Sequence, residues 1–344
     1  MAAQDLIAAE EAIFGGKPTE GFLDSQTLMR TDMNAVAVFD SLQPDFLIAA
    51  QGSPNNLEGA AVREAVRRNI KTVVVSDIHG SGLRANVPVE KRTDLSMVLF
   101  TAMDSEDARV LRHGTGCKER PSRFDPKIAE TGSPALDRFN ANVEPARLVV
   151  RMASPFPHVF HIIGQDDCTG DFLDGALRVA DAFSESVAVV SLHPKYLAVP
   201  ELCNAWLRRV RGSKSMILWA NGAATTHQYM ASSTYVVSGY STGLIEAGLI
   251  QNELGPIAVC WTSELIRKRM AEALGGLTVF PTVTYGAAIE VSSVEEFREK
   301  VPAPGTKAFR DFRAHAEDAL RTRLHVDGHA TDRIVAAIRE HAGI

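Results

Sequence analysis

Apolar and polar positions along this chain alternate between short β-branched runs and longer amphipathic stretches. From Pro44 onward, each short run is followed by about ten to fifteen residues with helical spacing of the apolar positions. Residues 57–68, for example, place Ala61, Val62 and Ala65 on one helical face. Strands that alternate with helices in this way form β-α-β units with parallel strands. The pattern therefore predicts a doubly wound α/β fold.

The predicted elements fall into two series separated by a polar segment, residues 140–147, that contains Pro145 and has the composition of a linker. The first series has strands at 46–50, 72–76, 96–101 and 127–131 and helices at 57–68 and 105–113. The second series has strands at 158–163, 187–191, 216–219, 234–237, 257–260 and 287–291, with helices at 170–183, 200–210, 223–231, 242–250, 263–274 and 294–300. Two further helices, 307–323 and 331–341, follow a proline-rich break.

This order predicts two Rossmann-like domains that face each other across a cleft. We expect a shortened N-terminal domain at 1–139, a second domain at 140–324, and a C-terminal helical segment at 325–344 that packs back on the first domain. The first 40 residues hold one short predicted helix, 5–14. They lack the strand and glycine-rich turn that usually open a nucleotide-binding domain.

Composition narrows the class of protein. The 344 residues are 45% hydrophobic and 23% charged, as in soluble globular proteins, and the net charge of -6 gives no overall basic field for nucleic acid. We expect a cytoplasmic protein, because no window is apolar enough for a transmembrane segment and residues 1–11 contain acids instead of a basic signal region. The sequence contains no C-x-x-C pair, so its cysteines indicate neither a metal site nor a disulfide framework. The four cysteines are Cys117, Cys168, Cys203 and Cys260.

The sharpest chemical signal follows the predicted strand 234–237. There the chain enters a turn that contains Ser241, Thr242 and Gly243 and opens directly into a helix. Such a turn presents backbone N–H groups and hydroxyls to a phosphate, and Glu246 lies one turn further on, where it can accept hydrogen bonds from ribose. The alternative is ordinary helix capping by Ser241 or Thr242, with Glu246 favoured by the helix dipole.

A second signal follows strand 187–191. His193 and Lys195 flank Pro194 just beyond the carboxyl end of that strand, where open α/β sheets bind ligands. Pro194 keeps His193 extended, so that its imidazole can reach a diphosphate. The alternative is a structural histidine at a strand end.

These motifs resemble those of the two-Rossmann, GT-B-fold nucleotide-sugar glycosyltransferases and the related non-hydrolysing UDP-N-acetylglucosamine 2-epimerases. The resemblance covers about residues 44–342. It implies a nucleotide sugar as substrate, with no separate cofactor and no metal. The motifs that carry it are His193-Pro194, Ser241-Thr242-Gly243 with Glu246-Ala247, Thr131-Gly132-Ser133-Pro134, Tyr285-Gly286-Ala287-Ala288 and Asp327-Gly328-His329-Ala330.

A base for the acceptor hydroxyl is expected at the ends of the first-domain strands. Asp77 and His79 lie in a Gly/Ser turn after strand 72–76, and Glu58 is the second choice. His193, Lys195 and the Ser241–Gly243 turn would then neutralise the leaving nucleotide. The alternatives are an Asx turn for Asp77 and a surface loop position for His79.

The leading hypothesis is a metal-independent glycosyltransferase that moves a sugar from a nucleotide donor to an unidentified acceptor. A sugar-nucleotide epimerase or hydrolase on the same fold is the rival enzyme class. A third reading is a non-catalytic homologue that acts as a binding subunit, which the missing glycine-rich turn supports. The sequence leaves a homo-oligomer open.

Overall fold

The chain is divided between two α/β units, each with its own parallel sheet. Unit 1 comprises Met1–Arg138, Ala273–Gly276 and Leu324–Ile344, and unit 2 comprises Phe139–Glu272 and Leu277–Arg323. The computed structural model describes residues 32–50, 57–76, 78–79, 94–117, 122–139, 142–147, 149–150, 156–164, 169–192, 200–220, 224–251 and 255–344. The predicted helix 5–14 lies outside these residues.

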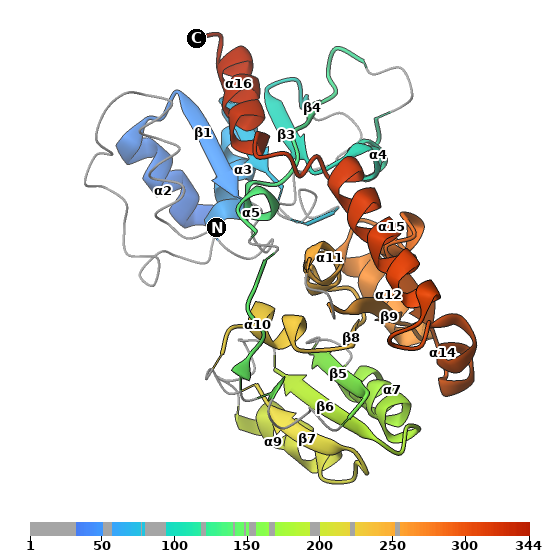
Figure 1. Ribbon diagram of the computed structural model, residues 1–344. Coiled ribbons are helices and arrows are strands. Elements are labelled where there is room, and N and C mark those ends of the chain that lie inside the picture. Colours follow the sequence, from blue (N-terminus) through green and yellow to red (C-terminus); the bar gives the residue numbers. More distant parts are fainter. Residues whose placement is uncertain are drawn as a thin grey trace. The chain divides into compact units, whose positions relative to one another are not determined.

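The sheet of unit 1 has four parallel strands in chain order, β1-β2-β3-β4, of which β1, β3 and β4 are labelled in Figure 1. They match the four strands expected from the first series, with ends that differ by at most two residues. Their bounds are β1 Phe46–Ala50, β2 Lys71–Val75, β3 Val98–Ala102 and β4 Lys127–Glu130, and the helices of this unit are α2 Asp32–Leu42, α3 Leu57–Arg67, α4 Ser105–Gly114, α5 Pro134–Asp137 and α16 Ala330–Ala342.

The two faces of this sheet are covered by helices from different parts of the chain. Val74 points to the face packed against α3 and α4, whereas Val73 and Val75 point to the other face, where Ile334 and Ile338 of α16 cover them. A sheet that winds in one direction with right-handed crossovers places its crossover helices on one face. The opposite face is therefore left for the C-terminal helix, shown in red in Figure 1.

Two of the sequence motifs meet where α16 is anchored. The Asp137 carboxylate accepts hydrogen bonds from the backbone N–H groups of Gly328, at 2.9 Å, and Ala330, at 2.6 Å. Arg333 donates to the Thr131 carbonyl at 2.8 Å. In unit 1 these motifs therefore hold the C-terminal helix to the end of β4.

Unit 2 has a six-stranded parallel sheet in the order β10-β9-β8-β5-β6-β7. Counted along the chain from β5, this is the strand order of the doubly wound nucleotide-binding fold, and its winding reverses between β5 and β8. The strands are β5 His158–Ile163, β6 Ser186–Ser191, β7 Met216–Trp219, β8 Tyr235–Ser238, β9 Ile257–Trp261 and β10 Ala288–Val291, and the helices are α7 Thr169–Asp181, α9 Pro200–Val210, α10 Thr226–Ala231, α11 Gly243–Leu249, α12 Glu264–Ala273, α13 Pro281–Thr284, α14 Val294–Lys300 and α15 Lys307–Arg323.

One helix of unit 2 begins later than its sequence pattern predicts. The expected helix 223–231 is α10, which begins at Thr226 because Thr225 and Gln228 form a reciprocal capping box. Among the described helices, none has both the length and the apolar character needed to cross a membrane.

Candidate functional site

The Ser241–Gly243 turn lies at the reversal point of the unit 2 sheet. It follows β8, which pairs with β5 on one side and β9 on the other. Ligands of open α/β sheets bind outside the carboxyl ends of the strands at such a reversal. The turn is therefore placed where the fold offers a ligand site.

The hydroxyl groups of this turn differ in what they bind. The Gly243 N–H donates to Ser241 Oγ at 3.2 Å, so Ser241 closes the turn locally. Thr242 occupies the N-cap position of α11, but its side chain makes no capping hydrogen bond. The local turn thus accounts for Ser241, and no capping hydrogen bond occupies the Thr242 hydroxyl.

Gly243 lets the turn approach the end of β5 closely. A Cβ atom at this position would lie 2.8 Å from Cδ1 of Ile163, the last residue of β5, and 3.2 Å from Cε of Met230. A Cβ here would require the ends of these two side chains to shift, so the turn packs closely against the last residue of β5.

Glu246 is paired with a histidine that sequence reasoning did not single out. Its Oε2 lies 3.2 Å from Nε2 of His227 on α10, and the two side chains are 26% and 40% exposed. The hydrogen bond to Glu246 raises the pKa of His227 above its usual value, because it outweighs the opposing effect of burial. The Phe139 ring meets the imidazole edge-on, with 4.9 Å between ring centroids.

A neutral polar pair lies beneath the same edge of the sheet. Nε2 of His161 on β5 is 2.6 Å from Oγ of Ser191, the last residue of β6. Complete burial lowers the pKa of His161 to about 3, so the imidazole is uncharged near neutral pH. His193 and Lys195, which follow β6 in sequence, lie outside the described residues.

In unit 1, His79 lies in a buried acidic cluster instead of a surface loop. Its Nε2 is 2.9 Å from Oδ2 of Asp104, and the two side chains are 0% and 2% exposed. Asp104 also caps α4 by accepting from the Asp107 N–H, and Asp107 accepts from the Met103 N–H. Burial opposes a charge on the imidazole, but the hydrogen bond and the nearby carboxylates prevail and raise the pKa of His79.

The remaining first-domain candidates are less fully described. Glu58 is in the first turn of α3, which follows β1, and is half-buried. Asp77 lies outside the described residues. Asp104 and Asp107 were not foreseen, although an Asp-x-x-Asp sequence directly after an apolar strand is a recognisable capping signal.

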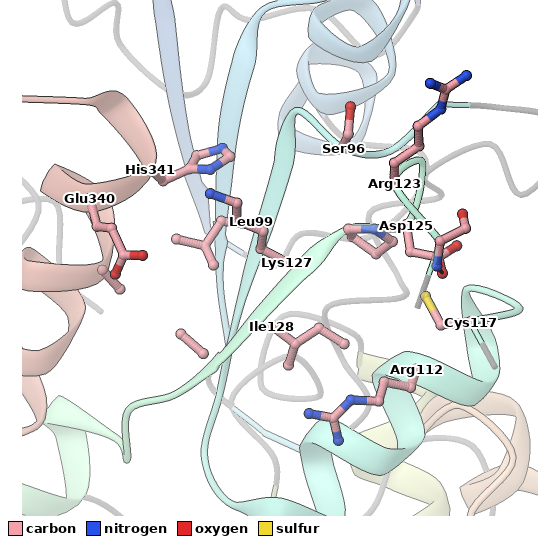
Figure 2. A pocket seen from close by; sticks show the side chains of 14 residues that line it. Ser96, Leu99, Arg112, Cys117, Arg123, Asp125, Lys127, Ile128, Glu340 and His341 are labelled. Atoms are coloured by element: carbon pink, nitrogen blue, oxygen red, sulfur yellow. Dashed lines mark hydrogen bonds between the residues drawn. The ribbon is translucent and has the colours of Figure 1, made fainter. Parts of the chain in front are cut away.

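A hollow of about 540 Å³ in unit 1 lies at the other end of the strands. Figure 2 shows Arg112 on α4 to one side of β4, and Glu340 and His341 on α16 to the other. Ser96 and Lys127 mark the amino ends of β3 and β4 in its wall. Ligand sites in open α/β sheets lie at the carboxyl ends, so the turn after β8 is the stronger candidate.

No protein-family model and no curated protein matches the sequence, whereas solved structures share its fold. MnaA of S. aureus in complex with UDP matches with a TM-score of 0.61 at 12% identity, over 98% of this chain and 87% of MnaA. Anabaena HepE in complex with UDP and glucose matches with a TM-score of 0.52 at 11% identity, over 90% of this chain and 82% of HepE.

A third match is the UDP-N-acetylglucosamine 2-epimerase of Methanocaldococcus jannaschii in complex with UDP-GlcNAc and UDP. Its TM-score is 0.51 at 13% identity, over 90% of this chain and 79% of that one. Matches at such identities establish the fold. The predicted GT-B-like α/β architecture with two Rossmann-like sheets is therefore confirmed.

Proposed function

We propose that this protein is a nucleotide-sugar enzyme that binds a uridine diphosphate sugar at the reversal point of the unit 2 sheet. The observation that carries the proposal is the Ser241–Gly243 turn between β8 and α11, beside the end of β5. In this arrangement the turn faces the diphosphate, and Glu246 accepts hydrogen bonds from the ribose hydroxyls. The fold is shared with structures that hold UDP, which supports the choice of nucleotide.

The reaction we propose is metal-independent transfer of the sugar to an acceptor hydroxyl. Such a transfer needs a base for the acceptor and positive or hydrogen-bonding groups for the departing diphosphate. Asp77 and Glu58 remain the candidates for the base, and His193 and Lys195 the candidates for the diphosphate. His79 is buried and paired with Asp104, so a structural part in unit 1 suits it better than direct contact with an acceptor.

Epimerisation or hydrolysis of the nucleotide sugar is the second candidate reaction. The fold likeness to a UDP-GlcNAc 2-epimerase over 90% of this chain favours it. A binding subunit without catalysis is the third.

Nucleotide binding tests the proposal first. Isothermal titration with UDP, GDP, CDP and CMP should show a preference for UDP. Glu246→Gln should weaken UDP binding by about 10- to 100-fold, because a hydrogen bond to a charged group contributes about 1.5–3 kcal/mol. The free energy of unfolding should change by less than about 1 kcal/mol, since a first-turn acid contributes little through the helix dipole.

Glu290→Gln is the matched control for this variant. Glu290 is also in unit 2, is 24% exposed and pairs with Arg267 at 2.6 Å. The control should bind UDP like the wild type. Equal affinities for all the nucleotides, or no loss in the Glu246 variant, would contradict the site.

Product analysis separates the three candidate functions. In an NMR assay of UDP-GlcNAc without acceptor, an epimerase or hydrolase produces new anomeric signals. A transferase releases UDP only after an acceptor is added. Binding without turnover of any UDP sugar, with or without acceptors, supports the binding subunit.

A further inference from the structure

The Glu246 carboxylate is held through one of its two oxygens. Oε2 lies against His227, and the structure records no other hydrogen-bond partner for this carboxylate among the described residues. A carboxylate can accept about four hydrogen bonds. Oε1 and the unused lone pairs of Oε2 therefore remain for a ligand, while His227 fixes the orientation of the group.

His227 lies in the first turn of α10, whose backbone is held by a capping box. In the capping box at the start of α10, Thr225 Oγ1 accepts from the Gln228 N–H at 3.2 Å, and Gln228 Oε1 accepts from the Thr225 N–H at 2.9 Å. The Phe139 ring packs edge-on against the imidazole. The backbone that carries His227 is thus held by the capping box and its ring is contacted by Phe139 without any ligand, which reduces the entropy lost on binding.

The helices that carry this pair contain no other charged residue, whereas α15, which packs against α11, brings Arg313, whose guanidinium donates to the Ile250 carbonyl at the far end of α11 at 2.8 Å. Glu246 is the one charged residue of α11, and His227 is the one titratable residue of α10 besides the buried Tyr229. An uncompensated carboxylate beside the turn would repel an anionic nucleotide, whereas an imidazolium at 3.2 Å cancels most of that charge.

We propose that His227 is a positioning residue that orients Glu246 for the ribose and, when protonated, removes the repulsion between Glu246 and the nucleotide phosphates. This role rests on the proposed function of the unit 2 site. By linkage, the protonated protein binds the nucleotide more tightly, and bound nucleotide favours the proton on His227 to the same degree.

UDP affinity as a function of pH tests the role of His227. From pH 6 to 9, UDP binding to the wild type should weaken by about tenfold, the factor that corresponds to a coupling of one pKa unit. His227→Gln keeps a side-chain donor but no charge, so its affinity should be weak at pH 6 and should change up to pH 9 only by the part that the ionisation of UDP causes in every variant. His227→Lys keeps the charge and should bind UDP tightly at pH 9.

The matched control is His329→Gln in unit 1. His329 also pairs with a carboxylate, that of Asp332, at 3.2 Å. Its pH profile should follow that of the wild type, and the ionisation of UDP itself affects all the proteins equally. NMR titration of the His227 ring protons should show a pKa about one unit higher with UDP than without it.

The outcomes separate this role from the function on which it rests. If the wild type binds UDP with the pH profile of His227→Gln, or if UDP leaves the titration of His227 unchanged, the role of His227 is wrong and the site stands. If the wild type does not bind UDP anywhere between pH 6 and 9, the proposed function and this role both fail.

Discussion

The two sheets of this protein both carry a histidine–carboxylate pair near the carboxyl ends of their strands, in opposite settings. His79 and Asp104 of unit 1 lie 2.9 Å apart with almost no solvent exposure. His227 and Glu246 of unit 2 lie 3.2 Å apart with 40% and 26% exposure. The distances are nearly the same, but only the second pair is open to solvent. Exposure therefore separates a structural pair from a candidate site better than chemistry does.

Strand order explains where each pair lies. The four strands of unit 1 follow chain order, so within the described part of this sheet the winding never reverses. Asp104 is the N-cap residue of α4, and the pair joins the start of this helix to the segment after β2. The unit 2 sheet reverses between β5 and β8, where adjacent crossovers diverge and leave room for a ligand.

The largest effect is expected from breaking the buried pair. Asp104→Ala leaves the His79 imidazole without its carboxylate and removes the cap of α4. Loss of one partner of a buried ion pair lowers the free energy of unfolding by about 3–5 kcal/mol. Urea unfolding monitored by circular dichroism should show this loss, while UDP affinity stays at the wild-type value.

The tryptophans and an exposed ion pair provide controls for this loss. All three tryptophans, Trp206, Trp219 and Trp261, lie in unit 2. The urea midpoint followed by tryptophan fluorescence should therefore shift much less than the midpoint followed by circular dichroism, to which unit 1 also contributes. Asp311→Ala breaks the exposed pair with Lys307 and should cost at most about 1 kcal/mol. Equal losses for the two variants would mean that the His79–Asp104 pair stabilises no more than a surface contact.

The two buried imidazoles should give opposite pH dependences of stability. The pKa of His161 is lowered to about 3 in the folded protein. At a pH between this value and the ordinary pKa, the imidazole is therefore protonated in the unfolded chain but not in the folded one. Stability should therefore fall as the pH drops from about 6.5 towards 3. The pKa of His79 is raised, so its contribution is complete below about 6.5 and is lost as the pH rises through the folded-state value.

Single variants show which histidine causes the loss of stability at acid pH and which causes the loss at alkaline pH. In urea unfolding from pH 4 to 9, His161→Gln should flatten the acid limb of the fluorescence transition, which reports unit 2. Asp104→Asn should flatten the alkaline limb of the circular dichroism transition. An acid limb that persists in His161→Gln would show that another group causes it.

Much of the fold follows from sequence periodicity. The apolar runs of the strands predicted both sheets, because buried parallel strands are continuous and β-branched. The boundaries that differ depend on local capping. Ser96, for example, belongs to a turn in which its N–H donates to the Asp94 carboxylate, so β3 begins only at Val98.

One part of the candidate site could be predicted from the sequence. The Ser241–Glu246 segment is recognisable because a strand, a Ser/Thr/Gly turn and a helix follow one another. The partner of Glu246 is 19 residues earlier in the chain, on another helix. No local pattern encodes that contact, because it depends on how α10 and α11 pack. The same holds for the burial of His79, which depends on the packing of α4 against the sheet.

The smallest effect separates capping from ligand binding at two threonines of unit 2. Thr225 accepts a capping hydrogen bond from the Gln228 N–H, whereas the Thr242 side chain makes no such bond at the N-cap of α11. Thr225→Ala should therefore lower the free energy of unfolding by about 1 kcal/mol. Thr242→Ala should change it by less than about 0.5 kcal/mol, the range of substitutions that remove no structural contact.

If the Thr242 hydroxyl faces the nucleotide phosphates, the Thr242→Ala variant should weaken UDP binding by about 3- to 10-fold, the value of one ordinary hydrogen bond. Urea unfolding and calorimetric titration of both variants measure the two quantities. A stability loss at Thr242 equal to that at Thr225, with UDP affinity intact, would assign Thr242 to the helix and not to the ligand.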